Sequence, residues 1–186
     1  MGKAIKIVGI LCLIIFSLIG CSNSEVKDSQ SMVEKFVKEL YTVDLEEIDN
    51  YNEFLNSKNN DIDVFNEEIE SMHKNLKPLM TEDAYSILLN NRINLAFIQL
   101  CAEGNYVMQV TDFSLSKTTD NTDGNNEGYK FEAKLKFISN KDKTEQEDVG
   151  KGYVGLTREG GKWKISGYKI NELPKVLEGS LTNNAN

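Results

Sequence analysis

Two side chains in this sequence have the types needed for nucleophilic chemistry, the single histidine His73 and the cysteine Cys101. A thiol beside an imidazole is the arrangement of a cysteine nucleophile and its base. A lone histidine excludes metal sites built on a histidine pair and zinc motifs that need several His or Cys ligands. Free cysteines usually behave as small buried hydrophobes, so we expect Cys101 in the core and His73 as a surface or half-buried side chain. The sequence therefore predicts no catalytic, metal-binding or cofactor-binding residue.

The polar stretch over residues 120–128 invites a comparison with calcium-binding loops. If Gly124 or Gly128 is the sixth residue of an EF-hand loop, the twelfth is Lys130 or Lys134, where calcium needs a bidentate glutamate. Strand patterns, rather than helices, flank the stretch. Its Asn, Asp and Gly content is typical of a turn, so we predict a polar hairpin loop.

The chain begins with a positively charged stretch followed by an apolar one. Lys3 and Lys6 precede Ile7–Ile19, 13 residues interrupted only by one glycine and one serine. This length suits the apolar region of a signal peptide and falls short of the roughly 20 residues of a membrane-spanning helix. We predict a signal peptide over residues 1–20.

The apolar stretch ends in Leu18, Ile19, Gly20 and Cys21. This pattern resembles a lipobox, at which a diacylglycerol is attached to the cysteine sulfur before signal peptidase cuts in front of it. The resemblance implies that Cys21 becomes the lipidated first residue of a protein anchored to the outer face of the bacterial cytoplasmic membrane. The alternatives are an uncleaved anchor helix, or an ordinary signal peptide with a chance cysteine.

Removal of residues 1–20 would leave 166 residues, enough for one domain with its own core. Two lysines leave with that segment, so the formal charge falls from −8 to −10. Such a field repels polyanions, so we expect no nucleic-acid partner and no flat contact with an anionic membrane. Cys12 would also leave and Cys21 would carry lipid, which leaves Cys101 without a disulfide partner. The excess of Lys over Arg and the abundant Asn resemble proteins of low-GC Gram-positive bacteria.

The first half of the sequence has helical patterns. Residues 21–30 are polar and lack periodicity, which predicts a tether that spans about 30 Å when extended. Ser31 and Glu34 have the spacing of a capping box at the start of a helix, and Asp44 and Thr81 are expected to cap two later helices. The apolar positions expected to face the core from four helices are Met32, Val33, Phe36, Val37, Leu40 and Tyr41; Leu45, Ile48, Tyr51 and Leu55; Phe65, Ile69, Met72 and Leu76; and Ala84, Tyr85, Leu88 and Leu89. Residues 93–103 fit a helix or a strand equally well.

After Gly104 the apolar period changes to two, which predicts strands over 106–117, 129–137, 149–158 and 162–170. A hairpin turn is expected at 159–161, and a switch of apolar parity across Ser166 and Gly167 predicts a bulge. The side chains expected to face inward are Phe113 and Leu115; Tyr129, Phe131, Ala133, Leu135 and Phe137; and Trp163 and Ile165. The prediction is an α+β domain over 31–177, with N-terminal helices packed on a strongly curved antiparallel sheet of about four strands, and a flexible tail over 178–186.

The order of elements and the final hairpin, Gly160-Gly161-Lys162-Trp163-Lys164-Ile165-Ser166-Gly167-Tyr168, resemble the nuclear-transport-factor-2-like superfamily over residues 31–177. In that family a bent sheet wraps a long helix to form a cone. The family includes isomerases, dehydratases, secretion-channel subunits and many lipid-anchored bacterial proteins without known activity. Because such different proteins share this fold, the fold alone does not indicate a function.

The isomerases and dehydratases of that family place an Asp base and a Tyr or Asp donor inside the cone. Asp112 and Tyr106 share one strand parity and could form such a pair. Asp112 could equally face solvent beside an inward Phe113. Both parities of this strand are mixed, so the sequence leaves the two alternatives open.

Taken together, these features favour a membrane-anchored extracytoplasmic lipoprotein whose domain is a non-enzymatic module that binds a protein or a small ligand. One alternative is an isomerase-like or dehydratase-like enzyme that uses the cone as its pocket. Another is an accessory subunit of an envelope or conjugative secretion assembly. The lipobox counts against this last alternative, because such subunits usually carry a transmembrane anchor.

Overall fold

The computed structural model describes residues 21–57, 62–119 and 124–177. The predicted signal peptide, with Leu18, Ile19 and Gly20, the side chain of Cys21 and the predicted tail lie outside the described residues. In chain order the elements are α2 (Cys21–Tyr41), α3 (Leu45–Asn56), α4 (Ile62–Met72), the short 3-10 helix η1 (Lys77–Leu79), α5 (Glu82–Asn91), α6 (Ile93–Gly104), β1 (Tyr106–Thr119), β2 (Asn126–Ser139), β3 (Glu145–Glu159) and β4 (Lys162–Glu172). The predicted α+β class is confirmed. Among the described residues, no helix combines the length and apolar character needed to cross a membrane.

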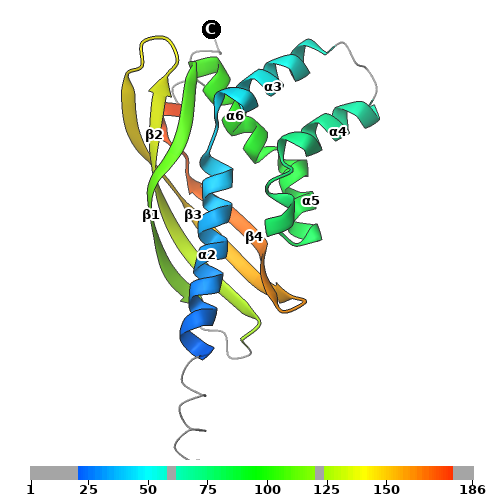
Figure 1. Ribbon diagram of the computed structural model, residues 1–186, viewed down its shortest axis with the longest axis vertical. Helices are drawn as coiled ribbons and strands as arrows, with labels where there is room; N and C mark the ends of the chain where they lie inside the picture. The colour runs from blue at the N-terminus through cyan, green and yellow to red at the C-terminus, as the bar shows by residue number, and fades with distance from the viewer. Residues whose placement is uncertain (1–20, 58–61, 120–123, 178–186) are drawn as a thin grey trace, which may run out of the picture.

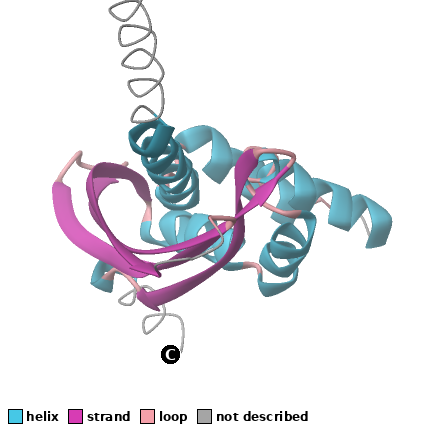
Figure 2. Cartoon of the chain, turned by 90° about the horizontal axis from the view of Figure 1, so that it is seen from below, coloured by secondary structure: helices cyan, strands magenta, loops and turns pink. Residues whose placement is uncertain are grey.

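The four strands form an antiparallel meander in the order β1-β2-β3-β4, and the sheet curves strongly around α2 (Figures 1 and 2). The β3–β4 turn lies at Gly160 and Gly161, with φ values of +57° and +80°. A two-residue turn with both φ values positive matches the right-handed twist of the strands, and glycine adopts it without steric cost. The predicted hairpin at 159–161 is confirmed.

Helix α2 lies along the inner face of the sheet (Figure 1). Its apolar side chains at 33, 36, 37, 40 and 41 have no exposed surface. They meet the inner face of β2, whose residues Tyr129, Phe131, Ala133, Leu135 and Phe137 are all buried as the alternation predicted. Tyr41 packs its ring 5.0 Å from that of Phe97 on α6 and edge-on to Phe131 at 6.1 Å, both distances between ring centroids. One continuous core therefore joins the helices to the sheet.

Two glycines of β3 allow the sheet to approach this core closely. A Cβ atom on Gly150 would lie 2.9 Å from the ring of Tyr41. A Cβ atom on Gly152 would lie 2.4 Å from the carbonyl oxygen of Lys169 and 2.6 Å from the ring of Phe131. Both positions need glycine because there is no room for a side chain.

Both edge strands contain bulges, and both are partly covered. In β1 the extra residues are Thr111 and Thr118. In β4 they are Ser166 and Asn171, so the bulge predicted at Ser166 is confirmed and Trp163 and Ile165 are buried as expected. Val43 forms a bridge to Met108 of β1 through backbone hydrogen bonds of 2.8 and 2.9 Å. On the other edge Met80 forms a bridge to Ile165, and the amide of Thr81 donates to the Ile165 carbonyl at 2.9 Å.

The predicted caps of α3 and α5 are confirmed. The Asp44 carboxylate accepts the amide of Glu47, and the Glu47 carboxylate accepts the amide of Asp44, both at 3.0 Å. This reciprocal pair satisfies two amide groups that the first turn of a helix leaves free. Thr81 caps α5 by accepting the amide of Ala84 at 3.2 Å. The inner stripe predicted for α3 is half wrong, because Ile48 and Tyr51 are buried whereas Leu45 and Leu55 are 53% and 60% exposed.

Two other predictions on the helices need correction or completion. The polar tether expected over 21–30 instead forms the beginning of α2, so Ser31 lies inside the helix and not at its N-cap. The later part of α2 packs against the sheet and already forms a helix. Adding further turns at its N-terminal end costs little free energy, because nucleation is the unfavourable step of helix formation. Residues 93–103, which the sequence left open, form α6 between left-handed residues at Arg92 and Asn105, with φ values of +52° and +58°. A residue in the left-handed conformation turns the chain out of the helical path and so ends the helix, and asparagine tolerates that conformation.

Candidate functional site

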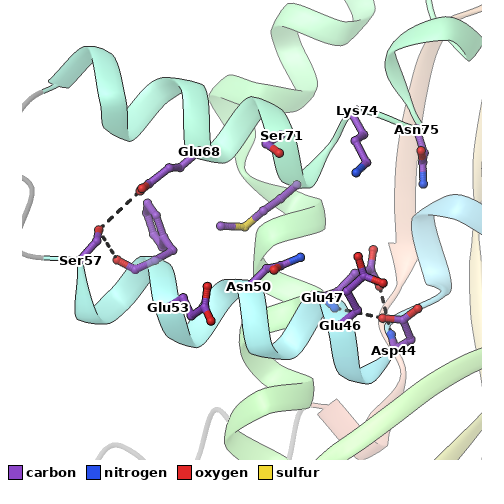
Figure 3. A pocket seen from close by; sticks show the side chains of 12 residues that line it. Asp44, Glu46, Glu47, Asn50, Glu53, Ser57, Glu68, Ser71, Lys74 and Asn75 are labelled. Atoms are coloured by element: carbon purple, nitrogen blue, oxygen red, sulfur yellow. Dashed lines mark hydrogen bonds between the residues drawn. The ribbon is translucent and has the colours of Figure 1, made fainter.

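A groove of about 610 Å³ lies between α3 and α4 (Figure 3). We call it the α3–α4 groove. Its lining comes from the side of α3 that faces α4, from the N-cap to the C-cap, and from the later part of α4 with the turn that follows. The lining residues are Asp44, Glu46, Glu47, Asn50, Glu53, Phe54, Ser57, Glu68, Ser71, Met72, Lys74 and Asn75. Most of them are exposed, so the groove opens on the surface and is not part of the core.

The α3–α4 groove is strongly acidic. Five of its lining residues are carboxylates, and Lys74 is the one basic residue among them. Ser57 donates its hydroxyl to the Phe54 carbonyl at 2.8 Å and lies 3.5 Å from a Glu68 oxygen, which connects the two helices at one end of the groove. Like charges gathered in one concave surface focus a negative potential there. The groove therefore attracts cations and repels anions.

Apolar surface is also present in the groove. Phe54 and Met72 are half-buried and pack against the edge of the core, with the ring of Phe54 6.4 Å from that of Tyr51. The groove thus combines a partly apolar floor with a carboxylate rim. This combination suits a segment that carries both apolar and basic side chains. No group of three or more His, Cys, Asp or Glu side chains among the described residues has the arrangement of a metal site.

Glu47 stands out among the groove carboxylates because it is half-buried beside its own cap. Burial raises the pKa of Glu47 to about 7, and the nearby carboxylates of Asp44, Glu39 and Glu46 add to the rise, although the Asp44 amide opposes it. Glu47 therefore changes its charge near neutral pH. The sequence identified Glu47 only as an acidic residue after a helix cap, since its burial depends on the later packing of α3 against α6.

The two candidate nucleophilic residues lie in the core. Cys101 is fully buried, as expected. Burial, with a smaller contribution from the Glu47 charge, raises the pKa of its thiol to about 12. A thiol with that pKa is not ionised near neutral pH, and the thiolate is the reactive form.

The expectation that His73 is a surface or half-buried side chain is wrong, because only 1% of it is exposed. Its Nδ1 lies 2.7 Å from the Ile69 carbonyl oxygen and donates to it, which leaves Nε2 without a proton. Within the described part of the chain, Nε2 has no hydrogen-bond partner. Burial lowers the pKa of the imidazole, although the hydrogen bond to Ile69 opposes the shift.

Asp112 and Tyr106 do not share an inner face. The bulge at Thr111 changes which alternate side chains of β1 face the core. Tyr106 lies before the bulge and has the inward parity, whereas Asp112 lies after it and has the outward parity. Asp112 is exposed and accepts a hydrogen bond from Lys134 at 2.8 Å. That hydrogen bond, together with one from the Phe113 amide, lowers the pKa of Asp112. Of the two alternatives, the solvent-facing Asp112 is the one observed, with Phe113 half-buried against the core.

A second hollow, of about 440 Å³, lies on the sheet near Lys130, Glu132, Lys151 and Glu172. Lys151 lies 3.2 Å from a carboxylate oxygen of Glu172 and 3.7 Å from one of Glu132. These ion pairs neutralise the charges around the hollow. It therefore lacks the unbalanced charge of the α3–α4 groove.

Comparison with known proteins gives no family. No family model and no curated protein matches the chain. Among solved structures, an IcmL-like type IV secretion system protein from Legionella pneumophila is 11% identical, with a TM-score of 0.43 over 77% of this chain and 88% of that one. The putative transfer protein TraH from the Gram-positive conjugative plasmid pIP501 is 14% identical, with a TM-score of 0.41 over 79% and 94%. The intermembrane space region of the chloroplast protein ARC6 is 10% identical, with a TM-score of 0.35 over 52% and 75%. At these identities and TM-scores the similarities carry no functional inference, and the chain is assigned to no family.

Proposed function

We propose that this chain is a lipid-anchored extracytoplasmic protein whose nuclear-transport-factor-2-like domain is a non-enzymatic module that binds a protein partner in the cell envelope. The anchor is the lipid that the Leu18–Cys21 pattern places on Cys21. The partner binds in the α3–α4 groove. The observation that carries this proposal is the position of the open acidic groove, which lies between α3 and α4 and away from the curved sheet.

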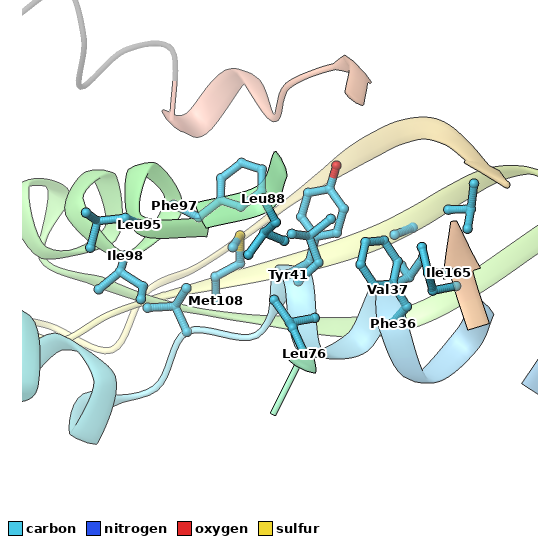
Figure 4. Close-up of a cluster of buried hydrophobic side chains, with 14 of the residues drawn as sticks. Phe36, Val37, Tyr41, Leu76, Leu88, Leu95, Phe97, Ile98, Met108 and Ile165 are labelled. Atoms are coloured by element: carbon cyan, nitrogen blue, oxygen red, sulfur yellow. The ribbon is translucent and has the colours of Figure 1, made fainter. Parts of the chain in front are cut away.

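The inner side of the sheet supports this choice of surface. Side chains from α2, α5 and α6 meet those of the sheet there, and Figure 4 shows Phe36, Tyr41, Leu88, Phe97 and Met108 as members of one buried apolar cluster. Each of these five side chains is at most 1% exposed. A small-molecule site inside the cone would require a space that these side chains occupy.

The chemistry of the α3–α4 groove supports a partner segment with basic and apolar side chains. Lysine or arginine would pair with the rim carboxylates, and an apolar side chain would cover Phe54 and Met72. An acidic or nucleic-acid partner would meet repulsion instead.

The anchor is tested by metabolic labelling with a fatty acid. We expect the wild-type protein to take up label and the Cys21→Ser protein to take up none. Cys101→Ser is the matched control, because Cys101 is buried in the core and should not carry lipid. Label retained in the Cys21→Ser protein would contradict the lipobox assignment.

The groove is tested by photo-crosslinking in intact cells. A photoreactive residue at Asn50 or Ser71, both exposed in the groove, should give a protein adduct of one defined size. A photoreactive residue at Glu159, exposed at the β3–β4 turn, is the control and should not. Glu53→Lys should reduce the groove adduct, whereas Glu159→Lys makes the same charge change elsewhere and should leave it. Adducts of equal yield from all three positions would contradict a specific site.

A further inference from the structure

The start of α2 is fixed to the sheet by a buried polar network. Ser29 has no exposed surface, and its hydroxyl lies 2.9 Å from the Tyr129 hydroxyl. Tyr129 donates its own proton to Glu127 at 2.7 Å, so Ser29 is the donor to Tyr129. Lys117 closes the network with a 2.8 Å ion pair to the other Glu127 oxygen. The network joins α2 to β1 and β2 near the hairpin between them.

The electrostatics of the network favour its closed form. Burial alone would raise the pKa of Glu127, but the hydrogen-bonded network of Lys117, Ser29 and Tyr129 outweighs it, and the pKa lies below its usual value. Glu127 is therefore ionised across the physiological range and accepts directly from Lys117 and Tyr129, while Ser29 joins the network through the Tyr129 hydroxyl. Charge-assisted hydrogen bonds of this kind are among the stronger ones in proteins.

We propose that α2 is a rigid spacer that sets both the height and the orientation of the domain above the membrane. Its end at Cys21 lies at the lipid, the hairpin end of the sheet faces the membrane, and the α3–α4 groove faces away. This inference depends on the proposed lipid anchor. The docked Ser29 lies eight positions after Cys21, which is about 12 Å along a helix at 1.5 Å per residue.

The arrangement of the elements fixes which end is which. The meander places the β1–β2 and β3–β4 hairpins at the same end of the sheet, and the Arg158 amide joins them by donating to the Asn125 carbonyl at 2.9 Å. The N-terminal end of α2 projects from that end, whereas α3 and α4 lie at the opposite end (Figure 1). A lipid at Cys21 therefore holds the hairpins close to the headgroups.

Charge favours the same orientation. The five carboxylates of the α3–α4 groove would be repelled by the anionic lipids of a bacterial membrane, at about 1 kcal/mol for each charge near the surface. The pair of Lys117 and Glu127 at the hairpin end is neutral as a whole. The domain would thus carry its most acidic surface furthest from the lipid, where a basic partner can reach it.

The test uses the full-length protein, expressed and lipidated in cells, purified and placed in vesicles of phosphatidylcholine and phosphatidylglycerol with a gadolinium-chelating lipid. A nitroxide is attached either at Lys162→Cys, in the hairpin end, or at Asn50→Cys, in the groove. Cys101 does not compete for the label, because it is buried and its thiol pKa is raised. We expect the gadolinium headgroups to enhance relaxation several-fold more at residue 162 than at residue 50.

Two variants separate a rigid spacer from a mere anchor. Residues 22–27 are replaced by a Gly-Ser segment of equal length, which is a flexible coil. In this variant the relaxation enhancements at residues 162 and 50 should become similar. Tyr129→Phe, which breaks the network but keeps the aromatic ring, should reduce the difference less. Circular dichroism and the melting temperature show that each variant is folded. A difference that persists unchanged in the Gly-Ser variant would overturn the spacer.

Failure of this inference is distinguishable from failure of the proposed function. The mass of the purified protein reports lipid at Cys21 directly, and its absence would overturn both. Equal relaxation at residues 162 and 50 in a lipidated protein would overturn the orientation alone. The photo-crosslinking result from the groove would remain valid in that case.

Discussion

Helices α2 and α3 are both amphipathic, but the protein uses their apolar faces differently. The apolar side chains of α2 at positions 33, 36, 37, 40 and 41 have no exposed surface, because the sheet curves around them. Helix α3 packs against α4 and α6 and fully buries only Ile48 and Tyr51, while Leu45 and Leu55 remain more than half exposed. The same helical period therefore leads to a core in one region and to a surface in the other. What decides the outcome is whether a second layer covers the helix.

Under the proposed function, stability and recognition depend on different regions of this molecule. Helix α2 and the sheet contain the largest buried side chains, whereas the α3–α4 groove contains the unbalanced charge. Changes in the first region should unfold the protein. Changes on the open side of the second should leave it folded and alter only what it binds.

The largest effect is expected at Trp163, which is 6% exposed and packs under the guanidinium of Arg158 at 4.8 Å from its ring centroid. Trp163→Ala should reduce the free energy of unfolding by about 3–5 kcal/mol, measured by denaturant unfolding. Lys162→Ala, at the exposed neighbouring position, is the control and should stay within about 0.5 kcal/mol of wild type. A tolerated Trp163→Ala would show that the sheet side of the molecule is not its stable region.

The next largest loss of stability is expected at Gly152, and it tests how tightly the sheet packs. Gly152→Ala should cost about 1–3 kcal/mol, because the new Cβ atom would overlap the Lys169 carbonyl and the Phe131 ring. Gly155→Ala is a matched control in the same strand, since its Cβ atom would lie 3.5 Å from the nearest atom, the Ser166 hydroxyl oxygen. Both variants are compared by their urea midpoints. Equal midpoints would mean that β3 has room to move away from the core.

A smaller change in the free energy of unfolding is expected from Glu47, which lies where the core meets the groove. Its folded pKa of about 7 exceeds the reference value of 4.5, so the stability it provides is complete below pH 4.5 and is lost as the pH rises through 7. Glu47→Gln keeps an acceptor for the Asp44 amide but cannot ionise. The Gln variant should match wild type at pH 5 and exceed it at pH 8 by on the order of 1 kcal/mol, a value reduced for solvent screening at a half-buried site.

The control for Glu47→Gln is Glu46→Gln, which alters an exposed carboxylate in the same first turn of α3. Its unfolding free energy should follow the wild-type pH profile. Parallel profiles for the wild type and the Glu47→Gln variant would contradict the raised pKa. An NMR titration of the Glu47 side-chain carboxyl would then give the true value.

The smallest effect is expected at Leu55, the most exposed large apolar side chain of α3. Leu55→Ala should change the free energy of unfolding by less than about 0.5 kcal/mol. Ile48 lies seven positions earlier on the same face of the helix but is buried, so Ile48→Ala should cost about 2–4 kcal/mol. The adduct formed from the groove should be unchanged in Leu55→Ala, because Leu55 is not among the residues that line the groove. A large loss of stability from Leu55→Ala would place this residue with the core and end the separation of the two regions.

The elements that local sequence specifies were predictable. The alternation from Tyr129 to Phe137 predicted a strand with one buried face, and the bulge at Ser166 follows from the parity change beside it. The caps at Asp44 and Thr81 were also predictable, because capping depends on residues within one turn of the helix. These signals need no knowledge of the rest of the chain.

Features that depend on tertiary packing were not predictable. Residues 21–30 have the composition of a tether, yet they continue α2 because Ser29 finds a partner in Tyr129, 100 positions later. The exposure of Leu45 and Leu55 depends on which neighbours α3 has, and periodicity does not contain that information. The α3–α4 groove was missed for the same reason, since its carboxylates come from separate helices.

The bulges at Thr111, Thr118, Ser166 and Asn171 also bear on aggregation. All four lie in β1 and β4, the two strands whose outer edges have no further strand beside them in the sheet. A long regular edge can pair with the edge of another copy, and a bulge interrupts the row of amides and carbonyls that such pairing needs. With the proposed lipid anchor, copies of the protein would share one membrane surface and collide far more often than copies free in solution. The irregular edges, with Val43 and Met80 covering part of each, would keep such crowded neighbours from joining their sheets into a fibril.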